Sequence, residues 1–258
     1  MKNEDILEKR IRPITSRLRK KDVAKDLPDK IYTRHFFELS DPQKKAYNAL
    51  QTECAINLSN YVDSRETLSI ENALSKLTRM RQITSGFLPT ETGETHAFKN
   101  NAKLNALLEV VSGTEDKIII WAEFRHDVNA IYDALNEKYG EESAVRLYGS
   151  IKQEDRQIAL VRFKHTDNTR FLVANYQTGA WGLTLIESAT TIMYSHTYNF
   201  EHRNQAEARN HRIGQSRPVT YIDLIAKDTV DEHIVDVLSL KQNVTHALLV
   251  NNWKRWFE

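Results

Sequence analysis

The sequence predicts an α/β fold, a parallel sheet with helices on both faces. From Lys117 onward, short β-branched runs alternate with amphipathic stretches, the pattern of strands joined by crossover helices. Crossovers of this kind are right-handed and bring the loops that follow the strands to one edge of the sheet. We therefore expect functional residues in the loops at the carboxyl ends of the strands.

Five strands are expected in this part of the chain. The first, 117–121, is a continuous apolar run typical of a buried strand. The other four cover residues 144–147, 171–174, 191–194 and 219–225. Helices are expected in the intervals, one with apolar residues from Val128 to Tyr139 at helical spacing and one from about 153 to 164.

Residues 1–101 show helical periodicity around Asn48, Ile56 and Leu77 and no convincing strand alternation. We expect a helical region there, and its stretch 84–101, with glycines and a proline among polar residues, is the candidate linker into a sheet domain over 102–228.

Residues 229–258 are expected to form a long final helix that runs toward Trp253, Trp256 and Phe257. It begins at Thr229-Val230-Asp231-Glu232, which has the spacing of a capping box. The acidic pair Asp231-Glu232 is therefore interpreted as the first turn of a helix, where acids complement the dipole, and not as a magnesium-binding box at the end of a strand.

Composition limits the class of protein. The chain has 258 residues, of which 40% are hydrophobic, enough for a buried core. No secretory signal or membrane anchor is visible, and no membrane partner is expected. The single cysteine, Cys54, excludes an internal disulfide and a thiolate metal site. We expect a soluble protein of a reducing compartment, the cytoplasm of a bacterial or phage-infected cell or, in a eukaryote, the nucleus.

Charge is distributed unevenly although the net charge is only +1. Between Lys9 and Lys25 the basic residues, Arg17, Arg19 and Lys20 among them, outnumber a lone Asp22. This block could contact a phosphate backbone. A solvated helix face is the alternative, which charge alone leaves open.

The most informative spacing is that of Gln205, Arg209 and Arg212, at i, i+4 and i+7. On a helix these residues project from one face, and two guanidiniums one turn apart can fork onto one phosphate. The alternative is a solvated helix face on which Arg203 pairs with Glu207.

A second candidate lies directly after the third expected strand. Residues 178–184 contain Gly179 and Gly182, and small residues let backbone amides approach a phosphate, as in other strand-to-helix turns of α/β proteins. A tight turn without function would need the same glycines.

The segment 205–215 resembles motif VI of the Swi/Snf family of superfamily-two helicases, whose pattern is QAxxRxHRIGQ, and every defining position matches. The resemblance extends over most of the chain. Five more segments resemble segments of the family: residues 77–83 (an LxxLRQI-type helix), 118–124 (motif IV), 147–150 (the next block), 179–183 (motif V) and 229–238 (the closing helix). The chain thus resembles the second RecA-like lobe of a DNA translocase, with 229–258 as its brace helix.

The resemblance implies roles for individual residues. Arg209 and Arg212 would be arginine fingers that reach the γ-phosphate of ATP held by the first lobe. The nucleotide-binding residues would be Gln205, Gly179, Gly182 and Leu183. The residues that face the DNA would be Tyr148, Gly149, Ser150, Thr178 and Tyr198, together with Arg17, Arg19 and Lys20. The chain departs from the pattern at Tyr198, where the family usually has tryptophan, and at Ala180, near a usual glycine.

A phosphate-binding loop is not found in these residues, because none of the eight glycines is followed by lysine. ATP and Mg²⁺ would therefore be bound mainly by a first lobe, located in the parent chain or in a separate polypeptide. We expect ATP-driven translocation on double-stranded DNA only when that lobe is present, and no hydrolysis by these residues alone.

Two other classes of protein fit the sequence less well. A non-enzymatic nucleic-acid binding module is disfavoured by the two arginines, since a pure binder needs no γ-phosphate sensor. A dinucleotide-binding oxidoreductase is excluded, since no GxGxxG follows a strand.

Overall fold

The computed structural model describes residues 10, 12–14, 26–64, 70–90 and 94–241. Six parallel strands form one sheet in the order β1-β8-β7-β4-β6-β5. Their bounds are β1 Lys30–Phe37, β4 Ile118–Ala122, β5 Ala144–Leu147, β6 Phe171–Asn175, β7 Thr190–Met193 and β8 Val219–Ala226. The expected parallel α/β fold, with its five strands after residue 117, is confirmed.

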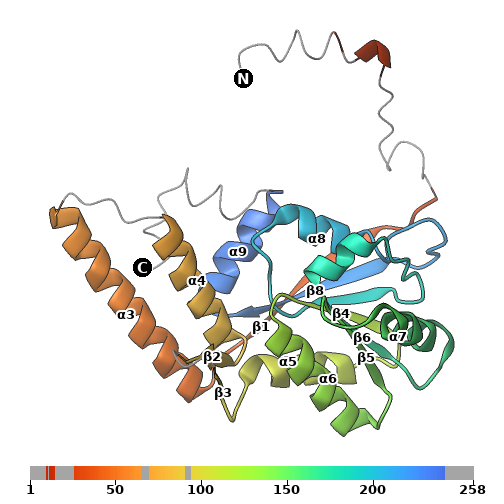
Figure 1. The fold of residues 1–258 in the computed structure, drawn as a ribbon, viewed down its shortest axis with the longest axis horizontal. Helices are drawn as coiled ribbons and strands as arrows, with labels where there is room; N and C mark the ends of the chain where they lie inside the picture. Colours follow the sequence, from red (N-terminus) through yellow and green to blue (C-terminus); the bar gives the residue numbers. More distant parts are fainter. Residues whose placement is uncertain (1–9, 11, 15–25, 65–69, 91–93, 242–258) are drawn as a thin grey trace.

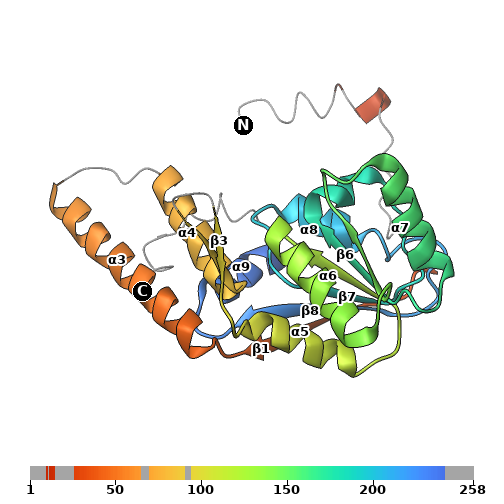
Figure 2. The same cartoon turned by 60° about the horizontal axis from the view of Figure 1, so that its bottom comes forward.

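Helices cover both faces of this sheet (Figures 1 and 2). On one face lie α5 (Ala102–Ser112) and α6 (Arg125–Tyr139), and on the other α7 (Gln153–His165) and α8 (Phe200–Glu207). Side chains of the central strand β4 alternate between the two layers: Ile118 and Ile120 pack with α5 and α6, whereas Ile119 and Trp121 pack with α7 and α8. A strand buried on both faces reads as a continuous apolar run, which explains why β4 was predictable.

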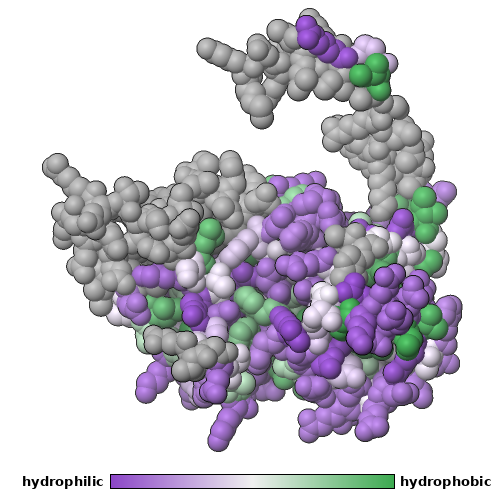
Figure 3. All heavy atoms as spheres, viewed as in Figure 1, coloured by the Kyte–Doolittle hydropathy of each residue, from purple (hydrophilic) through white to green (hydrophobic). Residues whose placement is uncertain are grey.

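Three helices pack together beside the sheet, at the left of Figure 1. They are α3 (Asp41–Ser64), α4 (Ile70–Thr84) and α9 (Val230–Ser239), and their shared core includes Tyr47, Leu77, Met80 and Ile234. A short 3-10 turn, Arg12–Ile14, precedes them in the chain. No helix in the described part of the chain is both long and apolar enough to cross a membrane. Hydrophilic side chains dominate the face shown in Figure 3.

Strand β1 corrects the expectation that residues 1–101 contain no strand. Lys30 pairs with Val219 and Phe37 with Ala226, in parallel register along the edge of the sheet. Its residues 31–34 are exposed, so the strand lacks the alternation of buried and polar residues by which sequence reasoning finds strands. The domain boundaries at 102 and 229 stay predictions.

The stretch 84–101 also differs from the linker that was expected. It forms an antiparallel hairpin of β2 (Phe87–Pro89) and β3 (Thr95–Ala97). Phe87 is buried, and its ring stacks on His126 at 4.2 Å between centroids. The stretch is therefore packed onto the domain that it was expected to precede.

The start of α9 agrees with the predicted cap. The Thr229 hydroxyl accepts a hydrogen bond from the Asp231 amide at 3.2 Å, and the Glu232 carboxylate accepts one from the Asp228 amide at 2.8 Å. Asp231 does more than complement the helix dipole, because it is buried and pairs with Lys103 on α5 at 2.6 Å. Helix α9 ends at Ser239, with Leu240 as its C-terminal cap, so the expected long helix does not continue past this point. Residues 242–258, and the basic residues Arg17, Arg19 and Lys20, lie outside the described residues.

Candidate functional site

The arginine pair lies in a turn and not on a helix. Helix α8 ends at Glu207, and Ala208 is its C-terminal cap. Arg209 and Arg212 follow in a turn in which the Arg212 amide donates to the Asn210 carbonyl at 3.1 Å. The expectation that one helix face presents both arginines is therefore wrong.

The two guanidiniums nevertheless converge on one segment, residues 182–184. Arg209 Nη1 lies 3.5 Å from the Leu183 carbonyl oxygen. Arg212 Nη1 lies 3.5 Å from the Gly182 carbonyl oxygen and donates to the Thr184 hydroxyl at 3.1 Å. Contacts with a segment some 26 to 30 residues away thus bring the arginines together.

Buried amide side chains fix the backbone around this pair. Asn210 donates to the Thr191 hydroxyl at 2.8 Å and the Ser188 carbonyl at 3.3 Å, and Gln215 donates to the Ile186 and Ser188 carbonyls, each at 3.1 Å. Sequence reasoning gave these two residues no role, although a buried amide is expected to be fully hydrogen-bonded. They hold the turn against the segment that leads into β7.

The hydrogen bonds of Asn210 and Gln215 also determine where the arginine pair lies relative to the sheet. Ser188 precedes β7, and Thr191 is near its beginning. The arginine turn is thus tied to the amino-terminal end of β7, whereas the predicted residues Gly149, Ser150 and Gly179 follow the carboxyl ends of β5 and β6.

The electrostatics of the pair favour an anion. Among the described residues no carboxylate forms an ion pair with Arg209 or Arg212, whose hydrogen bonds go to carbonyl and hydroxyl oxygens. Burial and the nearby charge of Arg212 lower the pKa of Arg209. Two adjacent cations that repel each other and lack a counter-charge are suited to a phosphate group.

The glycine turn, residues 178–184, lies beside the arginines. Its first part belongs to a 3-10 helix, η2 (Tyr176–Trp181), which contains Gly179 and begins directly after β6. Gly182 has a φ of 71° and therefore adopts the left-handed conformation that favours glycine. The Gln205 carbonyl accepts from Arg209 Nε at 3.0 Å. Gln205, through its backbone, and Gly182 and Leu183 thus adjoin the pair, whereas the Gln205 side chain donates to Glu201 at 3.3 Å. Their role in nucleotide binding stays a prediction.

The residues predicted to face DNA divide into two groups. Gly149 and Ser150 are exposed after β5, and the Tyr148 ring beside them is buried with the Arg125 guanidinium 4.9 Å from its centroid. Thr178 is fully buried, and its hydroxyl donates to the Asn175 carbonyl at 2.7 Å.

Tyr198 is half-buried and packs against the α4 and α9 cluster, with the Arg81 guanidinium 4.0 Å from its ring centroid. The side chains of Thr178 and Tyr198 are thus engaged in packing, whereas Gly149 and Ser150 stay accessible.

Arg203 is on a buried face and not on a solvated one. It pairs with Glu207, as the alternative interpretation expected, but it also forks onto Asp223 of β8, and 6% of its surface is exposed. Among the described residues no group of three or more His, Cys, Asp or Glu side chains could hold a metal ion.

The parallel sheet and its arginine-bearing turn define a RecA-like lobe, and comparison with known proteins agrees. Residues 102–214 match the helicase conserved C-terminal domain. The chain is 27% identical over 250 residues to an uncharacterized ATP-dependent helicase of Mycoplasma genitalium, covering 95% of this chain and 23% of the relative. It is 26% identical over 258 residues to the chromodomain-helicase-DNA-binding protein 1-like of Mus musculus, covering 96% and 28%. The chain thus spans about a quarter of these relatives.

Solved structures give the same result. The SWI2/SNF2 ATPase core of Sulfolobus solfataricus in complex with double-stranded DNA superposes with a TM-score of 0.65 at 25% identity, over 92% of this chain and 50% of that one. The C-terminal part of the Fun30 ATPase domain, at 18% identity, shares the fold with a TM-score of 0.69, over 82% and 90%. Residues 102–214 are thus a helicase conserved C-terminal domain, and the structures similar to the chain include a SWI2/SNF2 ATPase core, so the resemblance seen in the sequence is confirmed.

Proposed function

We propose that this chain is the second lobe of an ATP-dependent translocase on double-stranded DNA, in which Arg209 and Arg212 act as arginine fingers. The observation that carries the proposal is the convergence of both guanidiniums on residues 182–184 with no carboxylate partner in the described part of the chain. Two cations that lack a counter-charge and are held in place can stabilise the negative charge of a phosphoryl group during its transfer.

The nucleotide would be shared between two lobes. A first lobe would supply the phosphate-binding loop and the Mg²⁺ ligands. This chain would contribute Arg209 and Arg212, with Gln205, Gly179, Gly182 and Leu183 lining the same cleft. ATP, when bound, supplies the phosphoryl group, and the two guanidiniums stabilise its negative charge.

The DNA track would use a different part of the lobe. Gly149 and Ser150 are exposed at the carboxyl end of β5, where a backbone can approach a phosphate chain closely. The basic residues Arg17, Arg19 and Lys20 would add sequence-independent attraction. A similar ATPase core solved with double-stranded DNA supports this choice of nucleic acid.

Turnover of the lobe joined to a matching first lobe tests the proposal. Arg209→Ala and Arg212→Ala should each lower DNA-stimulated ATP turnover by about 10³ to 10⁵, the value of a trans-acting arginine in phosphoryl transfer. Arg212→Lys should stay impaired, because lysine keeps the charge and loses the planar fork. The control is Arg217→Ala, an exposed arginine that pairs with Asp116 at 3.0 Å, and its effect should be small.

Arg203→Ala is not a suitable control, because Arg203 is buried. Near-normal turnover in both alanine variants would refute the arginine-finger assignment. If the wild-type joined protein bound DNA but hydrolysed no ATP, the alternative of a non-enzymatic nucleic-acid binding module would be favoured. The isolated chain should release no phosphate from ATP at steady state.

A further inference from the structure

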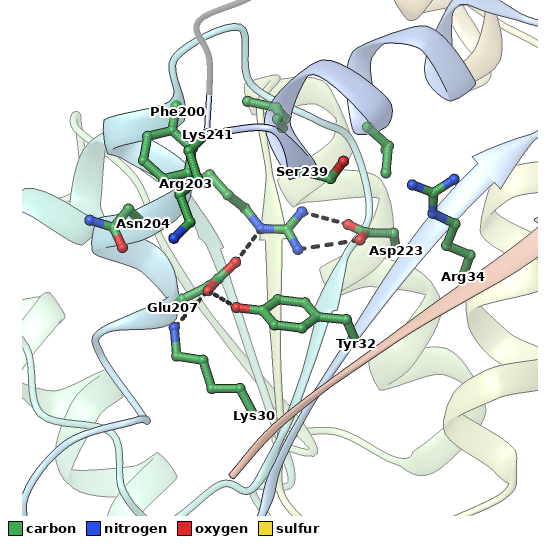
Figure 4. Close-up of a pocket in the computed structure, with 12 residues that line it drawn as sticks. Lys30, Tyr32, Arg34, Phe200, Arg203, Asn204, Glu207, Asp223, Ser239 and Lys241 are labelled. Carbon is green, nitrogen blue, oxygen red and sulfur yellow. Dashed lines mark hydrogen bonds and ion pairs between the residues drawn. The ribbon is translucent and has the colours of Figure 1, made fainter. Parts of the chain in front are cut away.

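A pocket of about 520 Å³ lies between β1, α8 and the end of α9 (Figure 4). Phe200, Val235 and Leu238 give it apolar walls. Another wall is formed by five polar residues, which we call the Glu207 cluster: Lys30, Tyr32, Arg203, Glu207 and Asp223. Because these residues come from β1, α8 and β8, the cluster joins three separate elements.

Glu207 is the centre of this cluster. Its Oε1 accepts from Arg203 Nε at 2.8 Å, and its Oε2 accepts from Lys30 Nζ at 2.8 Å and from the Tyr32 hydroxyl at 2.7 Å. Burial would raise the pKa of Glu207, but the charges of Arg203 and Lys30 lower it below its ordinary value. The carboxylate is therefore ionised, and both of its oxygens are occupied.

Arg203 connects Glu207 to the sheet. Its two terminal nitrogens donate to the two carboxylate oxygens of Asp223 on β8, at 2.5 and 3.3 Å. This bidentate arrangement depends on a planar guanidinium, which lysine cannot reproduce. Helix α8 is thus held to β8 through Arg203 and to β1 through Glu207.

The same cluster touches the backbone that leads to the arginine pair. Glu207 is the last residue of α8, and its carbonyl accepts from the Tyr221 hydroxyl at 2.8 Å. That hydroxyl also lies 3.2 Å from Asn210 Oδ1, and the Tyr221 ring stacks on Tyr32 of the cluster at 5.3 Å. The end of α8, immediately before Arg209, is therefore fixed both by the carboxylate and by the backbone carbonyl of Glu207.

We propose that Glu207 is a positioning residue, whose ion cluster keeps the end of α8 in place so that Arg209 and Arg212 stay over residues 182–184. The cluster also ties this position to β1, and a second bond, between His211 Nε2 and the Pro28 carbonyl at 2.8 Å, ties the turn to the residues just before β1. The geometry thus links the entry of the chain into the sheet to the place of the arginines. The catalytic part of this inference rests on the proposed function.

Amide hydrogen exchange of the 258-residue chain tests the position without any activity. The reporter is the Leu185 amide, which donates to the Arg209 carbonyl at 2.9 Å. Glu207→Gln keeps the size of the side chain and removes its charge, so exchange at Leu185 should become about ten- to a hundredfold faster, as loss of a charge-assisted hydrogen bond implies. The matched control is Asp236→Asn, which breaks the exposed Arg34–Asp236 pair between β1 and α9 and should leave Leu185 unchanged.

Arg203→Lys is a second, milder variant that retains the charge and loses the fork, in case Glu207→Gln fails to fold. It should accelerate the same amide to a smaller extent. Unchanged exchange at Leu185 in a folded Glu207→Gln protein would overturn the positioning role, whatever Arg209 and Arg212 do.

A second experiment tests the catalytic link by measuring ATP turnover of the lobe joined to a first lobe. Glu207→Gln should lower kcat by about ten- to a hundredfold, less than loss of an arginine finger, with unchanged DNA affinity. If turnover responds to Arg209→Ala and not to Glu207→Gln, the catalytic link is overturned. If it does not respond to Arg209→Ala, the proposed function fails and the exchange result decides the positioning role alone.

Discussion

The buried ion pair between Lys103 and Asp231 should contribute strongly to stability. Lys103 Nζ lies 2.6 Å from Asp231 Oδ2, and the two side chains are 1% and 3% exposed. Asp231 also accepts from the Thr84 hydroxyl at 3.1 Å, so the pair connects α5, α9 and the end of α4. The perturbation is Lys103→Met, which keeps most of the aliphatic volume and leaves the Asp231 carboxylate buried without its cation.

The expected magnitude follows from this burial. Removing one partner of a buried pair costs about 3–5 kcal/mol. At roughly 2–4 °C per kcal/mol for a protein of this size, the melting temperature should fall by about 6–20 °C. The matched control is Asp116→Asn, which breaks the Arg217–Asp116 pair, whose side chains are 47% and 48% exposed. An exposed pair contributes at most about 1 kcal/mol.

The pH dependence of the loss gives a second check. Burial would raise the pKa of Asp231, but Lys103 lowers it below the ordinary value. A depressed carboxyl pKa contributes stability that is present above the pKa of the unfolded chain, about 3.9, and is lost as the pH falls through the folded value. In Lys103→Met the burial that raises the pKa of Asp231 is no longer opposed by Lys103, so this pKa should lie above its ordinary value of about 3.9. The stability difference between wild type and Lys103→Met should therefore begin to narrow above about pH 4 as the pH falls, and should keep narrowing below it. Scanning calorimetry measures both effects, and a decrease at pH 7 no larger than that of Asp116→Asn would refute the reasoning.

Two other predictions concern a buried carboxyl group and the basic block. Burial raises the pKa of Asp127 to about 7 although Ser195 donates a hydrogen bond to it at 2.7 Å. Stability should therefore fall as the pH rises from about 4 towards 7, because the folded state retains a proton that the unfolded chain releases; Asp127→Asn should flatten this decline in urea titrations. Affinity for double-stranded DNA should fall with salt at a slope of about −0.9 per phosphate contact, and alanine at Arg17, Arg19 and Lys20 should reduce that slope in fluorescence anisotropy; a wild-type affinity insensitive to salt would contradict the prediction.

Strands inside the sheet were predictable because strands buried on both faces consist of consecutive apolar residues. Ile118 to Trp121 of β4 and Phe171 to Ala174 of β6 are buried on both faces, so each strand is a continuous apolar run. Strand β1 was not predictable in this way. It is at the edge of the sheet, and Ile31 and Tyr32, which point to opposite faces, are 45% and 55% exposed.

The residues of the candidate site could be predicted from the motif, but their geometry could not. Helical spacing implied that α8 continues through Arg212, whereas it ends at Glu207. The turn is held by Asn210 and Gln215, whose hydrogen bonds reach residues 186–191, and no local pattern records such contacts. Arg203 shows the same limit, since spacing identified Glu207 one helical turn away but not Asp223 on the next strand.

Because α8 ends before the arginines, the Arg209 carbonyl is available for a hydrogen bond that a continuous helix would not allow. In a longer helix the Arg209 carbonyl would accept a hydrogen bond from the amide four residues further on. Here it accepts from the Leu185 amide at 2.9 Å, so the arginine turn and the glycine turn are joined backbone to backbone. The left-handed φ of 71° at Gly182 lets the chain reverse just before this contact. The segment that lines the proposed nucleotide cleft and the residues that would sense its phosphate are therefore constrained to move together.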